Sequence, residues 1–309
     1  MNALLPAISG IFLPILLGLI SRRTHFINPE HRPHILQFAV RVCIPFMVFE
    51  SMRNIDTGTA GQFIPMTAGL FLFTALSWLT MYILIRVLIP YSNWVRQYKA
   101  ELLIMAFIGN IGYICWKIQE IVAGTEALQR GIFYTSFYWP ALIVFSLITL
   151  VVLKLTKAHS LDSKEILKNI IPLLAMLALG LTAGLLHLNL PEWLTAFTGS
   201  LGPIAVPTIL FCTGLSISVK GTAKAAGPIL PYLIVRQLIW IALFALILRL
   251  SWFDDISRKV LFINAFAPIG VTTMVICDMF GLDTDFAANA IALSTVIYLL
   301  MLPLLFLLW

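Results

Sequence analysis

The sequence predicts an all-α integral membrane protein of about ten transmembrane helices, arranged as two inverted repeats of five helices each. Composition gives the first observation: of 309 residues, 60% are hydrophobic and 11% are charged, whereas about 25% of the residues in soluble domains are charged. The second observation is that the hydrophobic residues form runs of about 18 to 28 residues, each long enough to cross the membrane as a helix. The third is a repeated pattern of proline between the two halves of the chain.

The expected helices follow one another with short polar connections. The first begins near the N-terminus without a basic segment or a small-residue cleavage site, so we expect a retained helix instead of a cleaved signal peptide. The first repeat is expected over residues 1–156 and the second over 167–309, joined by a polar cytoplasmic linker of residues 157–166. The expected helices span residues 3–21, 36–52, 63–88, 99–122, 127–154, 167–188, 193–217, 227–250, 258–280 and 285–309.

The basic residues predict the orientation in the membrane. About twice as many lysines and arginines fall in the connections on one side as on the other. Because cytoplasmic loops are enriched in these residues, the richer side should be cytoplasmic, which places both termini outside the plasma or inner membrane. The net charge of +6 is therefore a signal of topology, and nothing indicates a nucleic-acid partner.

The proline pattern indicates a duplicated module. Four prolines of the first half have counterparts about 160 residues later: Pro14 and Pro172, Pro45 and Pro207, Pro65 and Pro231, Pro140 and Pro303. Because each repeat contains an odd number of helices, the second copy must enter the membrane from the opposite face. Such inverted repeats, interrupted by glycine and proline at matching places, are typical of secondary transporters.

The fourth and ninth helices carry the strongest interruptions. Residues 109–112 (Gly-Asn-Ile-Gly) and 267–270 (Ala-Pro-Ile-Gly) lie near the middle of their runs, where glycine and proline weaken a helix. Either interruption alone could be a simple kink. Two unwound segments at corresponding positions predict a binding site, in which free N–H groups suit anions and free carbonyls suit cations. The candidate ligand-binding residues of these segments are Asn110, Gly112, Pro268, Gly270, Thr272 and Thr273.

Three ionisable residues inside the runs are further candidates. Lys117 could bind an anion or titrate during transport, or it could extend to the interface and pair with Glu120 or Glu126. Arg236 could contact a substrate carboxylate, or it could tie helices together through backbone carbonyls. Asp278 could couple transport to protons, or it could mark a solvated helix end. The four cysteines and five histidines have no metal-ligand spacing, so no metal site is expected.

At these residues the chain resembles the auxin efflux carrier family, which includes the plant PIN-FORMED carriers and bacterial malate or malonate carriers. The resemblance spans nearly the whole chain. It rests on Asn110-Ile111-Gly112-Tyr113, on Pro207 followed by Gly214-Leu215, and on Arg236, Ala267-Pro268 and Leu302-Pro303-Leu304. The chain differs from the family pattern at Cys115 and Lys117, where the family usually has glycine and proline.

The resemblance implies a fold like that of NhaA-type antiporters and bile-acid symporters, with the fourth and ninth helices crossing at the substrate site. Helices one, two, six and seven would form a scaffold that often dimerises, and helices three to five and eight to ten a mobile transport domain. The expected cargo is a small organic anion, moved by elevator-type alternating access. Lys117 or Asp278 would provide proton coupling; sodium coupling and uniport stay open, and no cofactor is expected.

Three functional classes other than a carrier are an enzyme, a sensor and a channel. The sequence has no H-E-x-x-H or G-x-S-x-G motif and no facing pair of intramembrane aspartates, so an enzyme is not expected. A membrane sensor that binds a small ligand without net flux is the alternative, and a channel-like facilitator is a third. Saturable net flux would separate a carrier from both.

Overall fold

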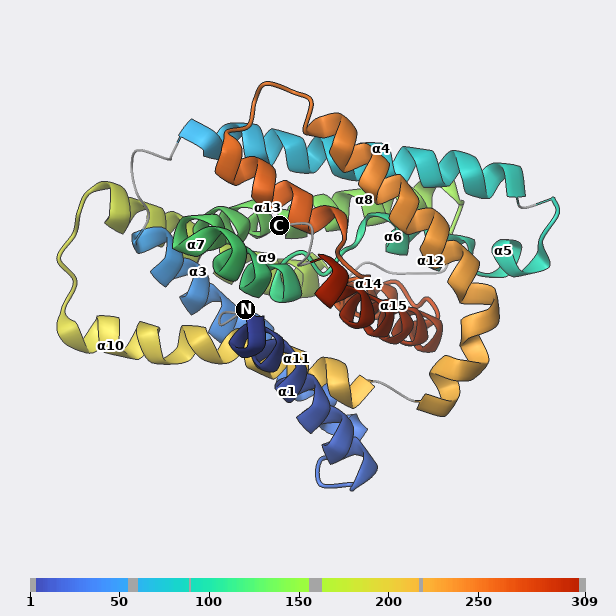
Figure 1. The fold of residues 1–309 in the computed structure, drawn as a ribbon, viewed down its shortest axis with the longest axis horizontal. Helices are drawn as coiled ribbons and strands as arrows, with labels where there is room; N and C mark the ends of the chain where they lie inside the picture. Colours follow the sequence, from blue (N-terminus) through green and yellow to red (C-terminus); the bar gives the residue numbers. More distant parts are fainter. Residues whose placement is uncertain (1–3, 55–60, 89, 156–162, 217–218, 306–309) are drawn as a thin grey trace. The chain divides into compact units, whose positions relative to one another are not determined.

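The computed structural model describes residues 4–54, 61–88, 90–155, 163–216 and 219–305. Helices are the regular elements of these residues, together with one isolated β-bridge (Figure 1). The predicted all-helical class is confirmed. Six segments of the described residues are long and apolar enough to cross a membrane: Arg32–Arg53, Ile64–Leu88, Ile114–Val152, Glu192–Leu215, Gly227–Ile247 and Thr284–Leu302.

Among its described residues, the first half of the chain contains eight α-helices, the 3-10 turn η1 (Pro29–His31) and one π-helical turn. Gly124 has φ 81° and interrupts α7, a backbone conformation that glycine adopts without steric cost. This turn falls between the fourth and fifth runs expected from the sequence. The elements are α1 (Leu4–Arg23), α2 (Arg32–Phe38), the π-turn η2 (Ala39–Cys43), α3 (Ile44–Arg53), α4 (Phe63–Leu88), α5 (Asn93–Gln97), α6 (Lys99–Phe107), α7 (Tyr113–Ser136) and α8 (Tyr138–Val152).

The second half repeats this order. Residues 192–216 combine a short helix, an irregular turn and a further helix, as residues 32–53 do. Residues 255–279 form a helix broken into two pieces, as the region after residue 99 does. Gly281, with φ 60°, lies between α14 and α15, in the position that Gly124 holds in the first half. The elements are α9 (Ser163–Leu185), α10 (Glu192–Leu201), η4 (Gly202–Ile204), α11 (Ala205–Ser216), α12 (Val219–Ile247), α13 (Asp255–Ala265), α14 (Thr272–Met279) and α15 (Thr284–Leu305).

The helices form two compact units. The first consists of Met1–Ile64, Gly112–Phe137 and Asp162–Ser216, and the second of Pro65–Ile111, Tyr138–Leu161 and Ile217–Trp309. The expected linker of residues 157–166 lies partly outside the described residues, and its last four residues begin α9. The division into scaffold and transport helices stays a prediction.

Glycine permits the closest helix contacts of the first unit. A Cβ atom at Gly18 of α1 would overlap the carbonyl oxygen of Phe211 in α11, and one at Gly180 of α9 would lie 2.7 Å from the carbonyl oxygen of Phe49 in α3. Gly180 lies about 160 residues after Gly18, and Phe49 lies about 160 residues before Phe211, so the second contact repeats the first with the two halves of the chain exchanged. The two helix pairs therefore pack through equivalent surfaces.

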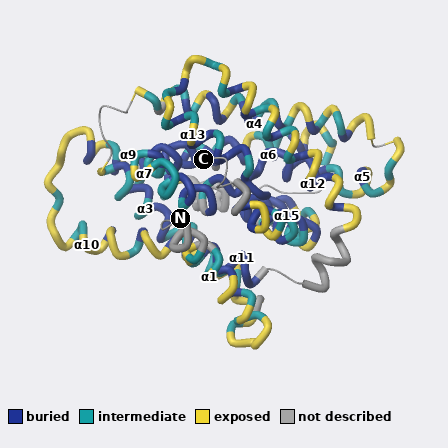
Figure 2. Tube along the Cα trace, viewed as in Figure 1, coloured by how far each residue is buried: buried dark blue, intermediate teal, exposed yellow. Residues whose placement is uncertain are grey.

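Aromatic side chains fill the centre of the second unit. Phe73 of α4 packs against Trp240 and Phe244 of α12, with ring centroids 4.8 Å and 4.0 Å away. The nine residues of α6 are nearly all buried (Figure 2). A short helix enclosed in this way keeps its polar ends away from solvent, so the ends need partners within the protein.

Candidate functional site

The two predicted interruptions meet in the second unit. Residues 108–111, the part of the first break that belongs to this unit, follow α6, and residues 266–271, the second break, follow α13. The backbone N–H of Asn110 donates to the carbonyl of Pro268 at 2.8 Å, and the N–H of Gly270 donates to the carbonyl of Ile108 at 3.2 Å. These two bonds form an antiparallel bridge between Gly109 and Ile269, and we call the two segments the paired breaks.

Glycine allows this close approach. A Cβ atom at Gly270 would lie 2.7 Å from the carbonyl oxygen of Gly109, and one at Gly109 would overlap the ring of Trp240. A side chain at Gly270 would push the two segments apart, and one at Gly109 would displace the ring of Trp240. The bridge therefore requires glycine at both positions. The glycines that weaken the helices thus also allow the breaks to pair.

Side chains bind the carbonyl groups left free at the end of α6. The hydroxyl of Tyr138 donates to the carbonyl of Phe107 at 2.5 Å and accepts a hydrogen bond from the N–H of Gly109 at 2.8 Å. The carbonyl of Ala106 accepts from Trp240 Nε1 at 2.5 Å and from Ser77 Oγ at 2.8 Å. Sequence reasoning missed Tyr138 and Trp240, although Trp240 lies one helical turn after Arg236.

Arg236 connects the two breaks. Its Nε donates to the carbonyl of Met105 at 3.1 Å, its Nη1 to that of Ala267 at 3.0 Å, and its Nη2 to that of Ile108 at 3.1 Å. The guanidinium also lies 3.8 Å from the ring centroid of Trp240, a favourable cation–π distance. Of the two roles considered for this residue, the structure shows the one in which arginine ties helices through backbone carbonyls.

The second break is held by residues of α12 and α15. Ser294 Oγ accepts a hydrogen bond from the N–H of Ile269 at 3.1 Å, and Gln237 Nε2 donates to the carbonyl of Ala265 at 2.6 Å. Thr272 is buried at the start of α14, and the backbone N–H of Thr273 donates to the carbonyl of Gly270 at 3.0 Å. The second break therefore keeps its shape through the same kinds of contact as the first.

Three buried polar side chains at or next to these contacts have atoms without a hydrogen-bond partner among the described residues. They are Asn110, 2% exposed, and Thr273 and Thr295, both fully buried. In Asn110 both the Oδ1 and Nδ2 atoms are unpaired in this way. A buried polar group without a partner costs about 1–3 kcal/mol, so these atoms are suited to a polar ligand.

The remaining predicted site residues fall elsewhere. Gly112 and Lys117 belong to the first unit, and Lys117 Nζ lies 2.7 Å from Glu120 Oε2, with the two side chains 41% and 38% exposed. This is one of the two pairings predicted for Lys117; Glu126 pairs with Arg130 instead. The side chain of Asp278, in α14, lies outside the described residues.

The second unit thus brings together Asn110, Arg236, Pro268, Gly270, Thr272 and Thr273. The four cysteines are buried thiols. Among the described residues, no group of three or more histidine, cysteine, aspartate or glutamate side chains is placed to hold a metal ion. The polar chemistry of the paired breaks comes from amide, hydroxyl, guanidinium and backbone groups.

Comparison with known proteins identifies a family of membrane transporters over nearly the whole chain. A family model described as membrane transport protein matches residues 4–306. The chain belongs to this family, that of the auxin efflux carriers. The predicted resemblance is confirmed, and with the six apolar segments it establishes an integral, multi-pass membrane protein.

Two curated relatives cover this membrane transport protein almost completely. An uncharacterized transporter of Methanocaldococcus jannaschii is 21% identical over 300 residues, which is 95% of each chain. An uncharacterized transporter of Methanothermobacter thermautotrophicus is 23% identical over 305 residues, covering 96% of this chain and 95% of the relative. The orientation of the termini and the kind of membrane stay predictions.

Proposed function

We propose that this protein is a secondary transporter that binds a small organic anion at the paired breaks and moves it by elevator-type alternating access. The observation that carries the proposal is the buried amide of Asn110, whose two polar atoms have no partner among the described residues. The bridge to Pro268 fixes its backbone. A carboxylate could accept from Nδ2, while a hydroxyl or a protonated group on the ligand could donate to Oδ1.

The charge of the second unit favours an anion. Arg236 is 1% exposed, and among the described residues it forms no ion pair with a carboxylate. Its guanidinium is bound by three carbonyl dipoles and by the ring of Trp240. Because a buried charge is weakly screened, Arg236 contributes a positive potential to the paired breaks, even though its three donors are directed at the backbone.

The proposed transporter has ten helices in two inverted repeats. Support comes from the equivalent glycine contacts at Gly18 and Gly180 and from the matching turns at Gly124 and Gly281. In this scheme helices one, two, six and seven form the scaffold, through which two copies would associate. Helices three to five and eight to ten carry the anion, and protons or sodium ions provide the coupling, with Lys117 and Asp278 as coupling candidates.

Uptake by proteoliposomes tests the proposal. The protein is reconstituted and offered a panel of radiolabelled mono- and dicarboxylates, with and without a pH or sodium gradient. We expect saturable uptake of at least one anion, and at least a tenfold loss of that uptake in Asn110→Ala. Since the Asn110 amide has no partner to lose among the described residues, the thermal stability of the variant should stay close to wild type.

The matched control is Asn289→Ala, which makes the same change in the same unit, where the amide donates to the carbonyl of Asp285. This control should transport normally. Equal uptake by Asn110→Ala and Asn289→Ala would contradict the proposed site. Binding of an anion without net flux would instead favour the sensor.

Lys117→Gln is a separate test of the coupling role. An exposed ion pair contributes about 0.2–1 kcal/mol to stability, so removal of the lysine should leave the fold intact. We expect uptake to lose its dependence on the pH gradient, whereas Glu120→Gln, which breaks the same pair, should keep it. The same response in both variants would restrict Lys117 to a structural ion pair.

A further inference from the structure

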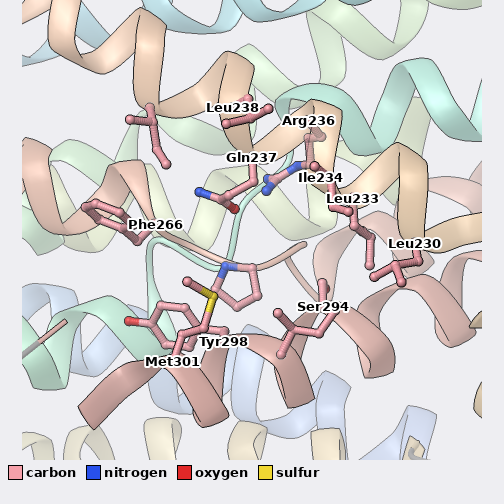
Figure 3. A pocket seen from close by; sticks show the side chains of 13 residues that line it. Leu230, Leu233, Ile234, Arg236, Gln237, Leu238, Phe266, Ser294, Tyr298 and Met301 are labelled. Carbon is pink, nitrogen blue, oxygen red and sulfur yellow. The ribbon is translucent and has the colours of Figure 1, made fainter. Parts of the chain in front are cut away.

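A crevice in the second unit lies beside the paired breaks but has a different chemistry. Its volume is about 280 Å³, and α12, α15 and the second break form its walls (Figure 3). Carbon atoms make up nearly all of its surface. The residues that define this lateral crevice are Leu233, Ile234, Phe266, Pro268, Ile297 and Met301.

Three polar side chains at the lateral crevice, those of Arg236, Gln237 and Ser294, are already engaged. Arg236 and Gln237 extend from α12 toward this space (Figure 3), but Arg236 donates to three carbonyls and Gln237 Nε2 to that of Ala265. Ser294 Oγ donates to the carbonyl of Ile291 and accepts from the N–H of Ile269. A carboxylate would find few donors here, so the crevice is poorly suited to the proposed cargo.

The rim of the lateral crevice is apolar and exposed. Both helical walls are long and apolar enough to cross a membrane, in the segments Gly227–Ile247 and Thr284–Leu302. The rim residues Ile234, Leu238 and Met301 are 53%, 62% and 46% exposed. In a chain that spans the bilayer, side chains of this kind contact hydrocarbon, and the crevice continues that contact surface inward.

Filling the lateral crevice with water and leaving it empty are both energetically unfavourable. The volume would hold roughly nine waters at about 30 Å³ each, but water needs two to four polar partners that these carbon atoms do not offer. An empty crevice would forfeit dispersion contacts along its walls. A flexible hydrocarbon chain from the surrounding bilayer satisfies both conditions.

We propose that the lateral crevice is a binding site for one acyl chain of a bilayer phospholipid. The bound chain packs between α12 and α15 and ends against Phe266 and Pro268. Because Pro268 lines the crevice and its carbonyl accepts the hydrogen bond from Asn110, the bound chain contacts a residue of the paired breaks. Transport activity is not needed to test this site.

Photo-crosslinking tests the proposal. The protein is reconstituted in liposomes containing phosphatidylcholine with a diazirine in the middle of one acyl chain, irradiated, digested and mapped by mass spectrometry. We expect adducts on residues 230–241 and 297–301 at several times the yield found at Leu246, which is 55% exposed on the same helix but outside the crevice. Equal yields at Leu246 and in the crevice would reduce the contact to ordinary boundary lipid and overturn the proposal.

A pair of variants sharpens the test. Met301→Trp places a larger side chain at the crevice and should lower the adduct yield on residues 230–241 at least threefold. Leu300→Trp, at the neighbouring position that is 74% exposed and outside the crevice, should leave that yield unchanged. An undiminished yield in folded Met301→Trp also overturns the proposal; if this variant does not fold, the wild-type comparison with Leu246 decides.

Discussion

Replacing Arg236 with leucine tests whether its guanidinium stabilises the paired breaks. The substitution removes the donors of three carbonyls. The carbonyl of Ile108 keeps the N–H of Gly270 as a partner, whereas the carbonyls of Met105 and Ala267 keep none outside the regular helices among the described residues. At about 1–3 kcal/mol for each buried group left unpaired, the variant should lose about 2–6 kcal/mol of unfolding free energy.

Thermal unfolding in detergent, followed by tryptophan fluorescence, measures this loss. In soluble domains of 150–250 residues, 1 kcal/mol corresponds to about 2–4 °C, so the apparent Tm should fall by roughly 5–20 °C. Arg249→Leu, at an exposed position after α12, makes the same chemical change and should alter stability by less than about 0.5 kcal/mol.

The reasoning would be refuted if Arg236→Leu were as stable as Arg249→Leu. That result would mean that burial of the uncharged side chain offsets the cost of the two carbonyls left without a donor. Arg236→Lys separates charge from geometry, because an ammonium keeps the charge but does not reproduce the planar fork of donors. We expect it to fall between wild type and Arg236→Leu in apparent Tm.

Two further predictions concern packing and the cap of α6. Gly18→Ala and Gly180→Ala should each lower the unfolding free energy by about 1–3 kcal/mol through overpacking. The control Gly199→Ala, where a Cβ meets nothing within 4 Å, should match or slightly exceed the stability of wild type. Chemical denaturation measures all three variants, and equal stability would contradict the close contacts. Tyr138→Phe removes the hydroxyl that joins Phe107 and Gly109 and should lower the unfolding free energy by about 1–3 kcal/mol. Hydrogen exchange of the backbone N–H of Gly109 should become faster. An unchanged exchange rate would show that another group binds this N–H.

Hydropathy and helix-breaking residues gave the outline of the fold. The runs of apolar residues predict the helical class, and the turn expected between the fourth and fifth runs lies at Gly124. Both interruptions are visible in the sequence because glycine and proline act on the backbone locally. The expected linker of residues 157–166 overlaps the start of α9 at Ser163, because helix ends depend on context that hydropathy does not contain.

Whether the sequence could identify the partner of a polar residue depended on how far apart the two residues lie in the chain. Glu120 lies one turn from Lys117, so the sequence could name that pair in advance. The acceptors of Arg236 lie in α6, the first break and the second break. They are more than thirty residues away on one side and more than a hundred on the other, and no local pattern identifies them. Tyr138 was missed for the same reason, because only the folded chain brings its hydroxyl to the end of α6.

The order in which Arg236 meets its acceptors bears on biosynthesis. Met105 and Ile108 precede it in the chain, whereas Ala267 follows it. An arginine at the centre of an inserting helix costs about 2.5–3.5 kcal/mol on translocon scales. When α12 leaves the ribosome, Met105 and Ile108 have already been synthesised, so we expect the first half of the protein to act as an intramolecular insertion partner for the second.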